Sequence, residues 1–163
     1  MKAAAALSAV WVLSLSSCAT PVPGRVEVSD EVPTYNDPKS RIACPSGSEK
    51  RTDAEFYRQL DATWDADETF PPPDGYAAPK MLRPPTVMYP RNILGLVKPG
   101  FVSVAFTVGI DGAARDPQVV CSSDRAFDRA ALDAIHTTRF VPAKLDGEAI
   151  AQVAILPIEF AIQ

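Results

Sequence analysis

The residues that could support catalysis are few and lie close together in the sequence. His136 is the only histidine among the 163 residues, and Ser122, Ser123 and Asp124 precede it. A Ser-His-Asp triad needs a serine held on a sharp turn, and no nucleophile-elbow pattern is present. We therefore interpret the two serines and Asp124 as caps of a helix, and His136 as a residue near its C-terminus.

Sequence motifs that hold a cofactor or a metal are absent. The chain has no glycine-rich phosphate loop, no dinucleotide fingerprint and no H-E-x-x-H zinc motif. The acidic cluster of Asp65, Asp67 and Glu68 lacks the ligand spacing and central glycine of a calcium loop. The net charge of −4 argues against a nucleic-acid partner held through phosphate contacts. We expect no cofactor, no metal, no small-molecule substrate and no enzymatic activity.

Residues 1–17 have the organisation of a processing signal. Lys2 supplies the positive charge, and residues 3–15 form an apolar run that is shorter than the ~20 residues needed to cross a bilayer. The sequence Leu15-Ser-Ser-Cys18 resembles a bacterial lipobox, which implies lipidation of Cys18. Because Ala19 follows the cysteine, the resemblance favours the periplasmic face of a Gram-negative outer membrane. An ordinary secretory signal and an uncleaved anchor are the alternatives.

Cys44 and Cys121 are the two remaining cysteines. In an oxidising compartment an even pair of this kind forms a disulfide, which here would fasten the N-terminal region to the domain that follows. The alternative is two unpaired thiols, one of them buried as a small apolar side chain.

Residues 18–83 are predicted to be a proline-rich acidic tether with one short helix at about 53–66. A capping-box pattern begins this helix, and apolar residues recur at every fourth position. These residues are Phe56, Leu60 and Trp64. We expect the stripe to pack on the following domain; binding of a partner is the alternative.

Residues 84–163 carry the pattern of one α+β domain. Apolar side chains alternate with polar ones before and after an Asp-Gly turn, which predicts a β-hairpin. The helix that follows has one apolar face, and a further apolar strand closes the chain. We expect an antiparallel sheet of about three strands against one long and one short helix. The predicted elements are a short helix at 91–97, strands at 101–108 and 114–121, a helix at 125–137 and a strand at 151–162.

Five pieces of this region together resemble the C-terminal domain of the TonB energy-transducer family. They are Tyr89-Pro90, the hairpin 101–121, the helix segment 127–135, Phe140-Val-Pro-Ala143 and Leu156-Pro-Ile-Glu-Phe160. The resemblance covers about residues 84–163, half of the chain. It implies a module that recruits the TonB box of an outer-membrane receptor by adding that extended segment to its sheet as a strand.

The resemblance assigns partner binding to the Tyr-Pro segment and the closing strand. The residues are Met88, Tyr89, Pro90, Arg91, Ile155, Pro157 and Glu159. For Tyr89 and Pro90 the alternative is ordinary anchoring of the domain, and Pro157 is also suited to protect a sheet edge. If binding is the main role of Tyr89, the change to alanine weakens peptide capture and leaves the melting temperature nearly unchanged.

These observations predict a membrane-tethered periplasmic protein that docks partner segments by strand addition during TonB-dependent transport. The expected partner is an outer-membrane TonB-dependent receptor or another envelope protein. TonB proper has an inner-membrane helix and a long Pro/Lys/Glu-rich linker, which this sequence does not match. Two alternatives follow. One is a structural envelope lipoprotein that uses the fold as a scaffold, and the other is a complete transducer in which residues 3–17 remain uncleaved.

Overall fold

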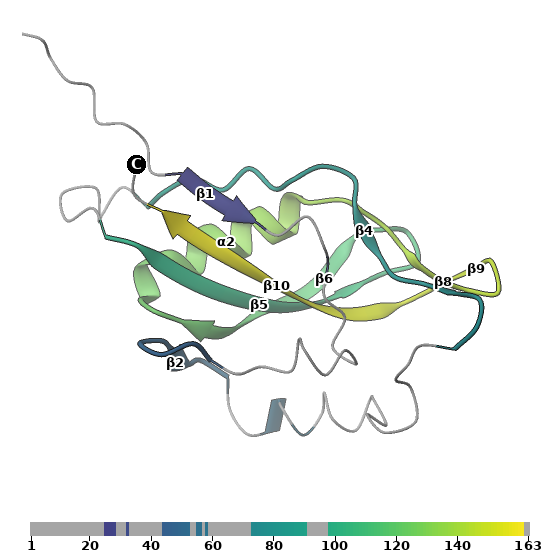
Figure 1. Ribbon diagram of the computed structural model, residues 1–163, viewed down its shortest axis with the longest axis horizontal. Coiled ribbons are helices and arrows are strands. Elements are labelled where there is room, and N and C mark those ends of the chain that lie inside the picture. Colours follow the sequence, from purple (N-terminus) through teal and green to yellow (C-terminus); the bar gives the residue numbers. More distant parts are fainter. Residues whose placement is uncertain are drawn as a thin grey trace, which may run out of the picture.

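The computed structural model describes residues 25–28, 32, 44–52, 55, 56, 58, 73–90 and 98–161. The predicted α+β class is confirmed, because a helix lies across an antiparallel sheet (Figure 1). The strands are β1 (Arg25–Val28), β2 (Glu49–Lys50), β3 (Tyr76–Ala77), β4 (Lys80–Met81), β5 (Gly100–Val108), β6 (Ala114–Ser122), β7 (Phe140–Val141), β8 (Ala143–Leu145), β9 (Glu148–Ile150) and β10 (Gln152–Ala161). The helix is α2 (Arg125–Thr137).

The main sheet has the strand order β1-β10-β5-β6-β2, and each pair of neighbours is antiparallel. The three central strands are those that the sequence predicted. The two edge strands come from the region before residue 84, which the sequence predicted to be a tether. The sheet is therefore wider than expected, because this N-terminal region pairs with both of its edges (Figure 1).

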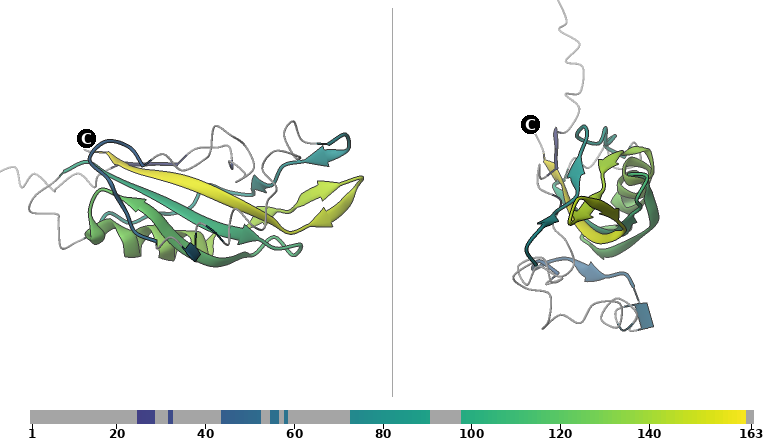
Figure 2. Two further views of the ribbon diagram at one scale, coloured as in Figure 1. Left: turned by 90° about the horizontal axis from the view of Figure 1, so that it is seen from below. Right: turned by 90° about the vertical axis from the view of Figure 1, so that its right-hand side faces the viewer.

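The core lies between the sheet and α2, which form two layers (Figure 2). The predicted helix boundaries and its buried face are confirmed. That face consists of Phe127, Ala131, Ala134 and Ile135. Alternate residues of β5 and β10 complete the core from the sheet side: Val102, Val104, Phe106, Val108, Ala154, Leu156, Ile158 and Phe160.

The predicted Asp-Gly turns are both present. In the first, the N–H of Gly112 donates to the carbonyl of Gly109, and Gly112 has a φ of +72°. In the second, Asp146 and Gly147 have φ values of +51° and +87° and join β8 to β9. Both β5–β6 and β8–β9 are therefore hairpins whose turns need the left-handed conformation, which glycine adopts without strain.

Residues 44–52 are fixed to the domain by three kinds of interaction. The predicted disulfide joins Cys44 to Cys121. Strand β2 pairs with the end of β6, and the N–H of Arg51 donates to the carbonyl of Val120 at 3.0 Å. The Arg51 guanidinium also lies 3.9 Å from a carboxylate oxygen of Asp128 on α2. This part of the N-terminal region is an integral part of the fold.

Several sequence predictions fall on residues outside the described part of the structure. These are the processing signal with Cys18, the helix at 91–97 with Arg91, and the acidic cluster at 65–68. Within the short helix predicted at 53–66, Glu55, Phe56 and Arg58 are helical, and Phe56 packs beside Ala105, Val120 and Ile155. Among the residues that the structure describes, no helix has both the length and the hydropathy to cross a membrane.

Candidate docking edge

Strand β10 is the element on which the candidate site is built. One side pairs with β5 without interruption, from Gln152 opposite Val108 to Phe160 opposite Gly100. Residues Ala154 to Leu156 are buried, as are Ile158 and Phe160, so two layers of packing hold the strand straight and extended. A strand fixed in this way presents its other backbone edge in a rigid, pre-formed geometry.

The other edge of β10 is paired with β1. The register places Arg25 opposite Ala161, Val26 opposite Phe160, Glu27 opposite Glu159 and Val28 opposite Ile158. In Figure 1 β1 lies beside the C-terminal half of β10, at the rim of the sheet. The described ladder ends at Ile158, next to Pro157, which has no N–H to donate to a further strand. We call β1 the resident strand, because it already occupies an edge that could accept another segment.

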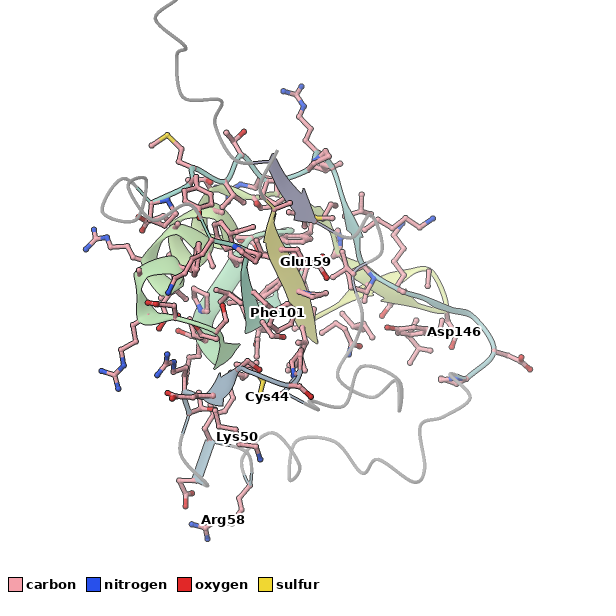
Figure 3. The ribbon with its side chains drawn as sticks, turned by 60° about the vertical axis from the view of Figure 1, so that its left-hand side comes forward. Cys44, Lys50, Arg58, Phe101, Asp146 and Glu159 are labelled. Atoms are coloured by element: carbon pink, nitrogen blue, oxygen red, sulfur yellow. A yellow bond between two sulfur atoms is a disulfide. The ribbon has the colours of Figure 1, made fainter. Side chains whose placement is uncertain are left out.

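The two faces of this edge differ in character. Ile158 and Phe160 are buried in the main core, and Val28 and Val32 pack against the same core from the N-terminal region. Glu159 is exposed and lies on the opposite face, where its register partner in β5 is Phe101 (Figure 3). A strand on this edge therefore meets apolar side chains on one face and a carboxylate on the other.

A hollow of about 410 Å³ lies at this end of the sheet. Its lining residues are Pro45, Pro99, Gly100, Phe101, Ser123, Glu159, Phe160 and Ala161. Glu159 is the only one of these residues that carries a charge. The hollow gives space beside the carboxylate for a long side chain from a neighbouring strand.

Tyr89 lies on the core side of β10. Its ring is 9% exposed and contacts the rings of Phe127 and Phe160 edge-on, with centroid separations of 5.7 and 6.1 Å. The hydroxyl donates to the carbonyl of Lys98 at 2.5 Å and accepts the Lys98 N–H at 3.2 Å. Tyr89 is thus a core residue whose polar end is fully paired.

Lys98 connects this segment to the start of α2. Its ammonium donates to Oδ2 of Asp124 at 2.6 Å, while Oδ1 of Asp124 accepts the N–H of Ala126 at 2.8 Å. These hydrogen bonds stabilise the charged carboxylate and hold the pKa of Asp124 below its ordinary value of 3.8, with the Lys98 bond as the larger cause. Asp124 is the N-cap of α2.

Met88 and Pro90 line a separate hollow between their own segment and α2. Its volume is about 600 Å³, and its helix side includes Arg125, Arg129 and Asp133. Met88 is 72% exposed, whereas Pro90 is partly buried. These two residues and the edge of β10 therefore present separate surfaces.

The model of a protein family described as Gram-negative bacterial TonB protein C-terminal matches residues 85–162. Protein TonB of Haemophilus influenzae is 43% identical over 60 residues, which are 36% of this chain and 22% of that protein. The chain therefore matches only about a fifth of that relative's length. The chain carries a TonB C-terminal domain. The solution structure of the Pseudomonas aeruginosa TonB C-terminal domain is 34% identical and covers 53% of this chain and 89% of its own, with a TM-score of 0.45.

Within the TonB C-terminal domain, the residues that the sequence assigned to partner binding do not form one surface. Glu159 and Pro157 lie on or beside the β1-paired edge, whereas Ile155 is buried against Ala105 and Val120. Met88 is exposed elsewhere. The expectation that Tyr89 contributes little to stability is wrong, because its side chain is in the core.

The sequence analysis missed β1 and Lys98. The four residues Arg-Val-Glu-Val of β1 do alternate between polar and apolar side chains, which is a weak strand signal. The role of Lys98 had no sequence signal, because it depends on the approach of the Tyr89 hydroxyl and Asp124 in three dimensions.

The residues first considered for catalysis have structural roles near α2. Asp124 caps the helix as expected, but Ser122 instead bonds to the backbone of Asp124, and the Ser123 hydroxyl accepts the N–H of Phe101. His136 is exposed in the last turn of the helix. In the described ranges, no three His, Cys, Asp or Glu side chains are grouped so that they could hold a metal ion.

Proposed function

We propose that this protein docks an extended segment of an envelope partner on the β1-paired edge of β10, as part of TonB-dependent transport in a Gram-negative bacterium. The expected partner is an outer-membrane TonB-dependent receptor. In this proposal Cys18 is lipidated and tethers the chain to a membrane on its periplasmic side. Docking involves no chemical step, because main-chain hydrogen bonds and side-chain contacts supply the affinity.

The observation that supports this function most directly is the pairing of β1 with β10. A four-residue segment from a distant part of the chain adds to this edge in an ordinary antiparallel register. No covalent link joins the two strands, because the disulfide lies at Cys44, well beyond the end of β1. The edge therefore accepts a strand, and the strand that it holds is short enough to be exchanged.

A closed scaffold is the second candidate function, and the same pairing favours it. If β1 never leaves β10, the edge stays covered and the domain has only a structural role in the envelope. The two candidates differ in whether a peptide can add to β10 when it is supplied in solution.

The test uses a fluorescein-labelled peptide that carries the TonB box of an outer-membrane receptor from the same bacterium. Binding to the full chain is measured by fluorescence anisotropy. The matched control is the same peptide with N-methyl groups at alternate residues, which removes main-chain donors and keeps every side chain. We expect the first peptide to bind and the N-methylated peptide to fail; equal binding of both would exclude strand addition.

A further inference from the structure

The resident strand and β10 carry like charges at one register position. Glu27 of β1 is directly opposite Glu159 of β10. Side chains at directly opposite positions of an antiparallel pair are close neighbours, and like charges there destabilise the pair. The resident strand is therefore a poor match to its own edge at this position.

The two positions that flank Glu27 match the edge well. Val26 is opposite Phe160 and Val28 is opposite Ile158. Both β10 residues are buried in the core, and Val28 packs against that core. The edge thus favours apolar, β-branched residues at these alternate positions, and the charge mismatch is confined to the position between them.

The surroundings of Glu159 favour a cation at the mismatched position. Phe101 is the register partner of Glu159 in β5, and both residues line the hollow of about 410 Å³. Glu159 is the only charged residue among the described residues that line it. A lysine or arginine side chain there would gain an ion pair with the carboxylate and a contact with the apolar wall.

We infer that the edge of β10 selects an extended partner segment with a basic residue opposite Glu159 and β-branched residues on either side, and that this segment displaces β1. The inference rests on the proposed docking function and adds the sequence class of the partner. The Glu27–Glu159 repulsion keeps β1 weakly bound, so the edge is covered when no partner is present and remains open to exchange. The disulfide at Cys44 keeps the displaced strand attached to the domain.

The experiment compares two peptides that differ at one position. Both have the sequence of residues 22–31, and one carries Glu27→Lys. A third peptide keeps Glu27 and carries Ser29→Lys, so it controls for the attraction of a cationic peptide to an acidic protein. The proteins are the full chain and a variant with residues 25–28 replaced by Gly-Ser-Gly-Ser, in which the edge is vacant. Thermal unfolding establishes that this variant is folded.

We expect the vacant-edge variant to bind the Glu27→Lys peptide about fivefold more tightly than the other two, which is the size of one cross-strand pair effect. Wild type should bind the same peptide more weakly than the vacant-edge variant does. Equal affinities for the Glu27→Lys and unaltered peptides, or for the two proteins, would overturn the inference and leave the docking function in place. Failure of every peptide, the TonB-box peptide included, to bind the vacant-edge variant would overturn the docking function itself.

Two point variants test the charge preference without removing β1. Glu159→Lys should reverse the preference between the two peptides. Glu148→Lys makes the same charge change on β9, which joins the turn at Asp146 far from Glu159 (Figure 3). It should leave the preference unchanged. A preference that shifts equally in both variants would reflect net charge alone and would contradict the inference.

Discussion

The ring of Tyr89 stands edge-on against the ring of Phe160, at a centroid separation of 6.1 Å and an interplanar angle of 78°. Phe160 in turn belongs to β10 and is the register partner of Val26 in the resident strand. The Tyr-Pro segment therefore acts on the docking edge through the core, by supporting β10 from its buried side.

Tyr89→Ala should lower the free energy of unfolding by about 3 kcal/mol or more, because it removes a large buried ring and leaves a cavity. Tyr89→Phe keeps the ring and should lower it by about 1 kcal/mol, since only the two hydrogen bonds to Lys98 are lost. Urea titration measures both. Met88→Ala is the control, because Met88 is 72% exposed, and it should leave stability nearly unchanged. A Tyr89→Ala protein as stable as wild type would contradict the placement of this ring.

Reduction of the disulfide should lower the free energy of unfolding by about 4.5 kcal/mol in the chain-entropy model, because Cys44 and Cys121 are 77 residues apart. The measurement is urea unfolding with and without a reducing agent. A double variant, Cys44→Ala with Cys121→Ala, is the control: reducing agent should leave it unaffected, and its stability should be close to that of the reduced wild type. Identical wild-type curves under both conditions would show that the bridge adds no stability.

The helix cap at Asp124 should make stability depend on pH in the acid range. Its pKa is lowered in the folded state, chiefly by the Lys98 ammonium, so the charged carboxylate stabilises the fold at pH values above the unfolded pKa. That contribution is lost as the pH falls through the folded pKa. Asparagine caps a helix about as well as aspartate but cannot titrate or pair with Lys98 as an anion. Asp124→Asn should therefore be less stable than wild type at neutral pH by less than about 1 kcal/mol.

The difference between wild type and Asp124→Asn should vanish in acid, and urea midpoints at neutral pH and well below pH 3.8 measure it. The wild-type curve alone is not sufficient, because the pKa of Asp111 is also lowered, first by the Ala113 N–H and then by Arg115. A difference of constant size across this range would contradict the assigned cause.

The hairpin and α2 could be predicted from the sequence because their signals are local. The alternation before Gly109, the Asp-Gly turn and the capping Asp124 each determine the conformation of a few neighbouring residues. Four-residue β1 could not be predicted in the same way. Its strand conformation depends on an edge more than a hundred residues away, and its only local signal is the alternation of Val26 and Val28 with charged residues.

The candidate site was predicted in outline and not in detail, for a related reason. A Tyr-Pro pair looks the same in the sequence whether the ring binds a partner or fills a core, and only the positions of Phe127 and Phe160 decide between the two. The importance of Glu159 likewise follows from what lies opposite it in the register, which the sequence order does not reveal.

Two turn glycines test the close contact between the first hairpin and β7. Gly112 and Gly147 both have positive φ, so alanine at either position should cost roughly 1–2 kcal/mol in backbone strain. A Cβ at Gly112 would also collide with the carbonyl oxygen of Phe140, whose own N–H donates to Gly112, whereas nothing lies close to a Cβ at Gly147. Gly112→Ala should therefore lower the melting temperature clearly more than Gly147→Ala in thermal unfolding. Equal losses would mean that the hairpin and β7 separate readily, and that this contact adds little to the fold.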